Sequence, residues 1–168
     1  MLKMVLDVLS TTPQKLAKEL SVLSRREIIT RPAEGKWSVQ EILAHLADVE
    51  ELGMRARVAA MIEQENPMLS PFDQEARAVE LEYDKIDARK SLASLVRQRR
   101  SNVRWLKKLR PAQFKRQGNH EGVGVISVED LVTEWAFHDI SHLRQILDVK
   151  RRLLFPHMGN MRAFYDLR

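Results

Sequence analysis

Two histidines four residues apart, and a third far from them in the chain, are the side chains whose type and spacing point to chemistry. On a helix, His138 and His142 lie about 40° apart on one face. The same projection groups His142 with apolar residues, namely Leu131, Trp135, Ile146 and Val149. The two imidazoles are therefore predicted to point into a core, where a ring nitrogen that loses water needs a polar partner or a metal.

The third histidine, His45, is predicted to face the core as well, because the projection groups it with Val49, Leu52 and Ala56. Three imidazoles on two helices match the ligand set of a divalent ion that keeps open positions for water or substrate. The alternative is that each one is a core histidine hydrogen-bonded to a neighbour. Three inward imidazoles are hard to satisfy in that way, so we predict that they bind one divalent metal, with zinc or nickel expected.

Polar residues around the predicted ligands are candidates for a catalytic or supporting role. On the projection, Asp48 lies about 60° and Glu41 about 40° from His45. We assign Glu41 to helix capping and keep Asp48 as a catalytic candidate, with an exposed surface carboxylate as the alternative. His120 is the second catalytic candidate, because its loop could overhang the site, although an exposed position without a role fits equally well.

Four more residues lie close to the predicted ligands. Gln145 and Asp139, on the same helix as the histidine pair, are expected to support the ligand rings from outside. Trp37 and Trp135 could stack on a substrate, but tryptophans beside a helix cap or on an inward face favour core packing.

Start and stop signals predict four long helices that would position these side chains. Thr12, followed directly by a proline, is the predicted N-cap of the first helix. Ser38 with Glu41 forms a capping box for the second, and Ser127 with Asp130 caps the fourth. The predicted helices run over residues 12–23, 38–64, 84–109 and 127–150, and the signals leave open whether residues 2–10 add a turn before the first.

The connections between these helices predict the topology. Residues 66–82 form a long connection with a short helix over 73–79, and a connection of this length can cross over and make consecutive long helices parallel. Residues 111–114 favour one more helical turn, strand-like alternation is confined to 123–126, and 153–168 form a tail. The predicted fold is all-α, a four-helix bundle with a long crossover connection.

Length and composition bound the class of protein. With 168 residues, 44% of them hydrophobic and 30% charged, residues 1–168 are expected to form a single globular domain. The net charge is +5, but the basic clusters at 97–104 and 150–152 are interpreted as solvated helix faces. Nucleic acid is therefore not an expected partner.

Cysteine is absent from the chain, so it has no thiolate nucleophile, and any thiol chemistry must use an external thiol. The apolar first ten residues are too short for a secretory signal and are interrupted by Asp7, and no segment has the length and apolarity of a membrane span. These features agree with a cytoplasmic protein.

Three stretches of the sequence resemble the DinB-like superfamily, the DinB/YfiT-like metalloenzymes, over roughly residues 12–150. They are RPAEGKWS leading into EILAHLAD in residues 31–48, GNH at 118–120 with Gly124 ahead of Ser127, and HDISHLRQ in residues 138–145. The resemblance implies a four-helix bundle with a crossover and one divalent metal, whose three histidine ligands fall here on His45, His138 and His142.

The resemblance also implies a range of activities. Members of this superfamily include transferases and isomerases that use glutathione, mycothiol or bacillithiol, and proteins named metal-dependent hydrolases. We therefore expect a metalloenzyme of the thiol-dependent S-transferase type, with a small-molecule substrate and a low-molecular-weight thiol as cosubstrate. The alternatives are a metal-dependent hydrolase and a non-catalytic metal-stabilised bundle that acts through association, for example as a homodimer.

Three structural features separate these alternatives. An open coordination position that faces a pocket favours an enzyme, whereas a fourth protein ligand, for which His120 is the obvious donor, favours a structural site. A hydrolase also needs a base near the metal. A thiol transferase needs a groove for the anionic groups of the thiol, for which Arg144 and Arg100 are candidates.

Overall fold

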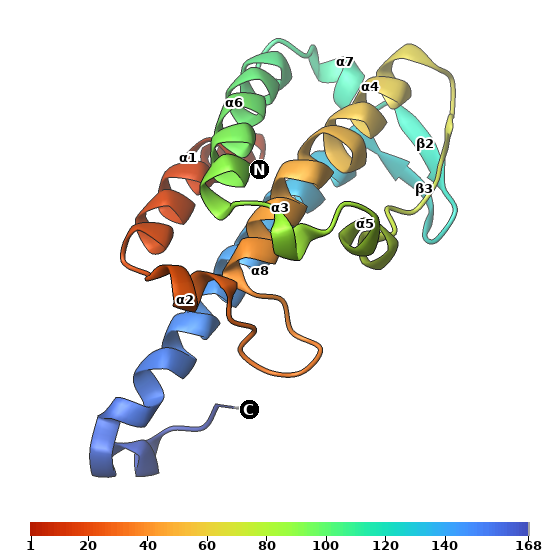
Figure 1. The fold of residues 1–168 in the computed structure, drawn as a ribbon. Helices are drawn as coiled ribbons and strands as arrows, with labels where there is room; N and C mark the ends of the chain where they lie inside the picture. Colours follow the sequence, from red (N-terminus) through yellow and green to blue (C-terminus); the bar gives the residue numbers. More distant parts are fainter. Residues whose placement is uncertain (168) are drawn as a thin grey trace.

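Four long helical segments form the body of the protein in the computed structural model, which describes residues 1–167 (Figure 1). They are α1 (Leu2–Ser21), α3 (Val39–Val49) continued by a π-helical turn (Glu50–Arg55) into α4 (Ala56–Glu63), α6 (Ala88–Leu106), and α8 (Val128–Leu154). The α3–α4 segment and α6 run in the same direction, because the connection between them crosses back along the bundle (Figure 1). The four-helix bundle with a crossover is therefore confirmed.

Helix α1 starts earlier than its sequence signals predict, and Thr12 does not cap it. Pro13 lies inside the helix and provides no N–H for the carbonyl of Leu9. That carbonyl instead accepts a hydrogen bond from Nη1 of Arg99 at 3.0 Å. The hydroxyl of Thr12 donates to the carbonyl of Val8 at 2.8 Å. A distant arginine thus replaces the missing partner and lets the helix continue through the proline.

Capping boxes begin both helices that carry the histidines, as predicted. The amide of Ser38 donates to the carboxylate of Glu41 at 2.8 Å, and the amide of Glu41 donates back to the serine hydroxyl. Ser127 and Asp130 form the same pair at the start of α8. Helix α8 then continues to Leu154, a turn beyond its predicted end.

The π-helical turn was not predicted, and it changes which side chains face the core. A π turn adds a residue and so rotates the helix face that follows. Leu52 is 51% exposed and Ala56 is exposed, although an uninterrupted helix would place both on the face of His45. Glu50, the first residue of the turn, lies on the buried face of α3 and is 0% exposed. The predicted extent of the second helix is thus correct, but the prediction of which side chains face the core is wrong after the first three turns.

The shorter helices lie in the connections. The short helix predicted over 73–79 is present, and Asp73 caps it. The third long helix begins after Asp84, because a 3-10 turn comes first and Asp87 accepts from the amides of Arg89 and Lys90. The unpredicted helix α2 begins with its own capping box. The bounds are α2 (Arg25–Ile29), α5 (Gln74–Glu80), the 3-10 turn Tyr83–Lys85, α7 (Pro111–Phe114) and the 3-10 turns Phe155–Phe164.

A small sheet at one end of the bundle was also not predicted. Strands β2 (Gln117–His120) and β3 (Gly124–Ser127) form an antiparallel hairpin, and β1 (Met68–Leu69) pairs with β2 in parallel. Strand β3 coincides with the strand-like alternation noted at 123–126, whereas β1 and β2 are too short or too polar to show an alternating pattern. The hairpin holds His120 beside the bundle.

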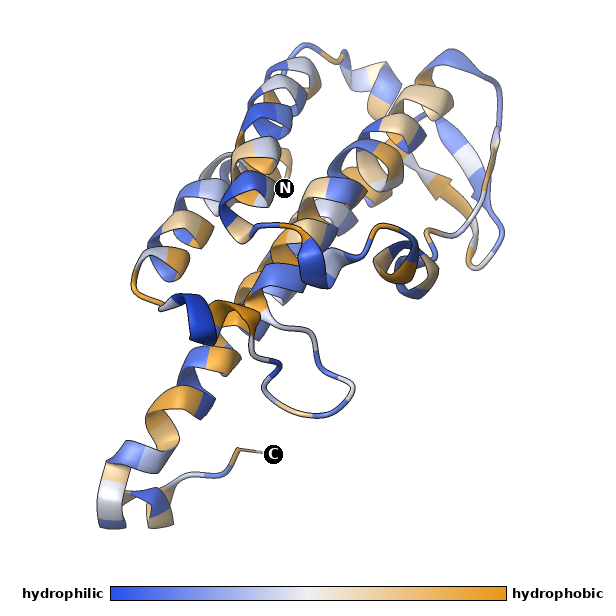
Figure 2. Ribbon diagram, in the orientation of Figure 1, coloured by the Kyte–Doolittle hydropathy of each residue, from blue (hydrophilic) through white to orange (hydrophobic). Residues whose placement is uncertain are grey.

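The core consists of two apolar layers with a polar layer between them. On α8 the histidine pair lies between Ala136 of one apolar layer and Ile146 of the other. On α6, Arg99 lies in the same way between Leu95 and Val103. Figure 2 shows hydrophobic and hydrophilic residues alternating along the long helices, as expected when one face of each is in a core. The predicted metal ligands thus lie in a polar layer in the middle of the bundle.

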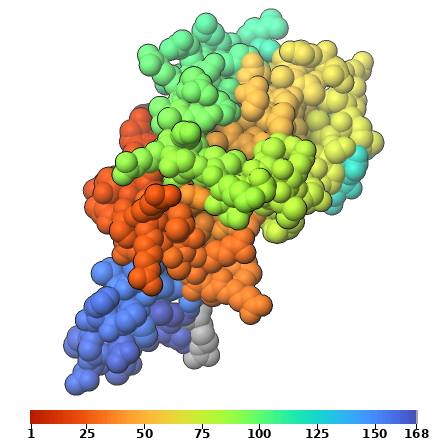
Figure 3. Space-filling model, viewed as in Figure 1, coloured from red at the N-terminus to blue at the C-terminus, as the bar shows by residue number. Residues whose placement is uncertain are grey.

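The last turns of α8 project beyond the bundle and carry the C-terminal residues with them (Figures 1 and 3). The tail beyond Leu154 turns back in 3-10 conformation and is held by Arg152, which donates to the backbone oxygen of Leu167 at 2.9 Å. Among residues 1–167, no helix combines the length and apolarity needed to cross a membrane.

Candidate metal centre

The three predicted ligands meet in space. Nε2 of His138 lies 3.1 Å from Nε2 of His45 and 3.1 Å from Nε2 of His142. Ligand atoms of all three lie within 4.8 Å of one another, and no other such group of histidine, aspartate or glutamate side chains occurs in residues 1–167. His45 is 1% and His142 6% exposed. Helices α3 and α8 thus bring three imidazoles from distant parts of the sequence to one buried point.

Burial keeps these imidazoles neutral. Desolvation, with the two neighbouring histidines, lowers the pKa of His45 to about 2. Desolvation, with His142 and Arg99, lowers the pKa of His138 to about 3. The pKa of His142 is also lowered by desolvation, against the opposing effect of Gln145. Neutral imidazoles with converging nitrogens are the donor set that a divalent ion requires, so the residues present fit one.

Gln145 sets the tautomer of one ligand. Its side-chain oxygen lies 2.9 Å from Nδ1 of His142 and accepts the proton of that nitrogen. The lone pair of His142 is therefore on Nε2, which faces the other histidines. This supporting contact was expected from the sequence. Nδ1 of His45 and Nδ1 of His138 are buried without a hydrogen-bond partner among the described residues.

Aromatic rings enclose the histidines. The ring of Trp37 lies 5.0 Å from that of His45 and stacks nearly parallel to His142, at 6.5 Å and 11°. Phe72 and Tyr83 also lie within ring contact of His45, at 6.0 and 6.3 Å. Trp37 therefore packs on the ligands, and the rings exclude water from one side of the cluster.

The structure places the two catalytic candidates in different surroundings. Asp48 accepts hydrogen bonds from Arg77 at 2.7 Å and from the hydroxyl of Tyr83 at 2.6 Å, and so ties α5 and the following turn to α3. Its carboxylate is not among the clustered ligand atoms. His120 lies on the hairpin, where its Nδ1 accepts from the amide of Gly122 at 3.1 Å, and it lines a pocket with two of the ligands.

That pocket, which we call the apolar pocket, has a volume of about 440 Å³ and reaches His45 and His138. Most of its wall is made by apolar side chains, namely Val49, Met54, Pro71, Phe72, Val123, Ile126 and Leu131. The polar residues Arg57 and Glu134 lie in it as well. Partial desolvation raises the pKa of Glu134, against the opposing charge of Arg57. Glu134 was missed from the sequence, although it lies one helical turn before His138.

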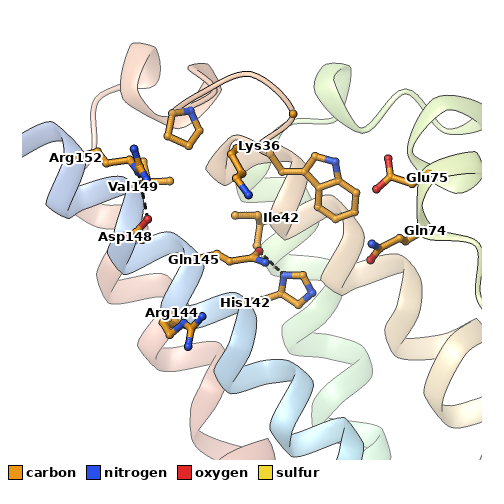
Figure 4. A pocket seen from close by; sticks show the side chains of 13 residues that line it. Lys36, Ile42, Gln74, Glu75, His142, Arg144, Gln145, Asp148, Val149 and Arg152 are labelled. Atoms are coloured by element: carbon orange, nitrogen blue, oxygen red, sulfur yellow. Dashed lines mark hydrogen bonds and ion pairs between the residues drawn. The ribbon is translucent and has the colours of Figure 1, made fainter. Parts of the chain in front are cut away.

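A second pocket, which we call the polar pocket, has a volume of about 370 Å³ and reaches His142 (Figure 4). It lies between the loop before α3, the start of α5 and the second half of α8. Its charged lining residues are Lys36, Glu75, Arg144, Asp148 and Arg152. Arg144, a candidate for a groove near the site, is among them, whereas Arg100 lies in a different pocket beside α1. The histidine cluster therefore borders one pocket through His45 and His138 and another through His142.

A buried ion-pair network forms the rest of the polar layer. Arg99 donates to both carboxylate oxygens of Glu50, from 2.8 to 3.0 Å, and to Asp139. Glu50 also accepts from Asn102 at 2.9 Å and from the indole of Trp135 at 3.0 Å. With the carbonyl of Leu9, the network joins α1, the π turn, α6 and α8. It fixes the register of the helices that carry the ligands.

This network corrects two expectations. Arg99 belongs to a basic cluster interpreted as a solvated face, yet its side chain is buried. Burial alone would lower the pKa of this arginine, but the negative charges of Asp139 and Glu50 outweigh that effect and raise the pKa. Asp139 was expected to support a ligand ring but binds Arg99 instead. The sequence gives no signal for either contact, because both partners come from other helices.

The fold and the site define a class of protein, namely an all-α bundle with a buried three-histidine cluster that could hold a divalent metal. The chain belongs to the DinB superfamily, whose family model matches residues 9–146.

Relatives of this chain carry names that refer to metals. YfiT of Bacillus subtilis, provisionally named a metal-dependent hydrolase, is 27% identical over 152 residues, which span 88% of this chain and 83% of that protein. A provisionally named metal-dependent hydrolase of Oceanobacillus iheyensis is 27% identical over 141 residues, or 83% of this chain and 80% of that protein. The solved structure of YfiT, described as a probable metal-dependent hydrolase with an unusual four-helix bundle topology, superposes with a TM-score of 0.83 at 26% identity, over 90% of this chain and 86% of that one.

Proposed function

We propose that this protein is a metal-dependent S-transferase, which joins a low-molecular-weight thiol to an electrophilic small molecule. The observation that carries the proposal is that two pockets of different character border one histidine cluster, the polar pocket at His142 and the apolar pocket at His45 and His138. A reaction between two dissimilar reactants needs both to approach one centre, and this arrangement provides a separate approach for each. The chain contains no cysteine, so the sulfur nucleophile must come from outside.

The residues of the chain divide the task between them. His45, His138 and His142 would hold the ion, for which we expect zinc or nickel, and Gln145 keeps His142 in the tautomer that can bind it. A divalent ion held by neutral ligands supplies Lewis acidity, which favours the ionised form of a nucleophile. The apolar pocket, whose lining includes His120, would bind the electrophile and keep water from it.

A conjugation assay tests this proposal. Zinc- or nickel-loaded protein is incubated with glutathione, cysteine or 2-mercaptoethanol and with monochlorobimane, a thiol-reactive electrophile that becomes fluorescent on conjugation. We expect turnover above the uncatalysed rate with at least one thiol, and loss of this turnover in His138→Ala. Equal rates with and without protein for every thiol would contradict the proposal.

A metal-dependent hydrolase is the second candidate, favoured by Glu134 and by the names of the relatives. Glu134 shares the apolar pocket with His138, and its raised pKa suits a group that takes a proton from an attacking water. Hydrolysis of p-nitrophenyl esters without any thiol, abolished in Glu134→Gln but not in the control Glu129→Gln, whose side chain does not line the apolar pocket, would favour the hydrolase.

A further inference from the structure

The polar pocket contains two cations without a partner. Lys36 lies on the loop before α3, and Arg144 lies on α8, two residues after His142. Neither side chain makes a hydrogen bond or an ion pair with any of residues 1–167. Figure 4 shows both among the side chains that surround His142 and Gln145. Exposed cations at the wall of a pocket are available to a ligand.

The other charges of the pocket leave it with an excess of available positive charge. Arg152 is bound to Asp148 at 3.2 Å, so these two charges of the lining compensate one another. Glu75, at the start of α5, is the remaining anion of the lining. Two free cations against one free anion favour a ligand with negative charge.

The uncharged part of the pocket indicates the shape of that ligand. Trp37, Ile42 and Val149 form the apolar part of the lining, and His142, which also lines the pocket, belongs to the histidine cluster. An anionic group held at the cations would therefore be connected by an apolar or neutral chain to the atom that reaches the histidines. The two oxygens of a carboxylate can pair with the two-pronged donor set of an arginine, and a lysine adds a second positive charge.

We propose that the polar pocket is a binding site for the carboxylate end of the thiol cosubstrate, with Lys36 and Arg144 as its binding residues. The inference rests on the proposed S-transferase function, because it requires that the other end of the ligand is a sulfur atom that reaches the histidine cluster beside His142. It divides the site into a carboxylate-selecting side at the polar pocket and a side for the electrophile at the apolar pocket.

A matched pair of thiols tests the inference by binding alone. Cobalt-substituted protein is titrated with 6-mercaptohexanoate and with 6-mercaptohexanol, and the sulfur-to-cobalt charge-transfer absorption reports binding. The two probes have the same chain length, and only the first carries a carboxylate. With two exposed ion pairs, we expect the acid to bind about threefold to tenfold more tightly. High salt should reduce the preference.

Two double variants with equal loss of charge complete the test. Lys36→Gln with Arg144→Gln should abolish the preference for the acid and leave the affinity for the alcohol within about twofold. Arg104→Gln with Lys108→Gln removes two exposed cations that line neither pocket, and it should keep the preference. Equal binding of both thiols by the wild type, or a preference that survives the first double variant, overturns the inference but leaves the S-transferase proposal. If neither thiol gives the absorption band, both fall.

Discussion

At the scale of single residues, the metal-binding role predicted for the three histidines can be tested one side chain at a time. His142 contributes one of three converging nitrogens, and its replacement by alanine leaves two donors in a buried site. His142→Ala should therefore lose stoichiometric zinc or nickel, measured by elemental analysis after dialysis against micromolar metal. His157→Ala, at an exposed histidine of the tail, should bind as the wild type does. Wild-type binding by His142→Ala would contradict the assigned ligand set.

Burial of these imidazoles also predicts a pH dependence of stability. Their ordinary pKa is 6.5, and it is lowered to about 2 in His45 and about 3 in His138. At pH values between the lowered and the ordinary pKa, these histidines bind protons in the unfolded chain but not in the folded chain, so acid destabilises the metal-free fold. Each histidine should contribute up to about 1.4 kcal/mol per pH unit below its ordinary pKa.

Urea unfolding of chelator-treated protein between pH 7 and pH 4 measures this effect. The free energy of unfolding should fall less steeply with decreasing pH in His45→Gln than in the wild type, because glutamine takes up no proton in the unfolded chain. Identical slopes would show that His45 titrates normally in the folded protein.

At the scale of secondary-structure elements, the sequence was informative wherever the signal was local. Ser38 and Ser127 cap the predicted helices, and the inward face of α8 around His142 follows from one helical period. The ligand cluster could be predicted because two such faces carry all three histidines. Features that depend on a distant partner could not be predicted. One example is Pro13, which the helix tolerates because Arg99 donates a hydrogen bond to the carbonyl of Leu9.

The π turn is a second feature that could not be predicted from the sequence. Glu50, the first residue of this turn, is buried in the core, where its carboxylate accepts hydrogen bonds from Arg99, Asn102 and Trp135 on two other helices. Sequence periodicity assumes a constant turn and misplaces Leu52 for that reason. Glu134 was missed because nothing local distinguishes a pocket carboxylate from one on a solvated face.

The buried network yields a prediction for the packing of the helices. Arg99→Met leaves Glu50 and Asp139 buried without their cation, and removing one partner of a buried ion pair typically costs about 3–5 kcal/mol. Urea unfolding should show this loss. Arg97→Met, on the same helix at an exposed position, should stay within about 0.5 kcal/mol of the wild type. A loss below about 1 kcal/mol in Arg99→Met would mean that the network does not hold the helices in register.

At the scale of the whole molecule, the expected homodimer stays a prediction. Exposed apolar side chains recur every seven residues on α8, at Ile140, Leu147 and Leu154. A seven-residue apolar repeat is typical of paired helices, so α8 is the face on which a second copy would pack. Sedimentation velocity should show a concentration-dependent dimer that Leu147→Lys dissociates. A monomer at all concentrations would contradict it.

The two apolar layers predict how the fold responds to loss of its metal. An ion that binds only the folded protein, present at a hundred times its dissociation constant, stabilises it by about 2.7 kcal/mol, which for a chain of this size corresponds to about 5–10 °C in Tm. Chelation should lower the Tm by that amount. The layers on either side of the histidines contain no metal ligand, so the metal-free protein should keep its helical circular dichroism at 25 °C. Loss of the helical signal on chelation would show that the polar layer, and not the apolar layers, holds the bundle together. An unchanged Tm would show that no ion is bound.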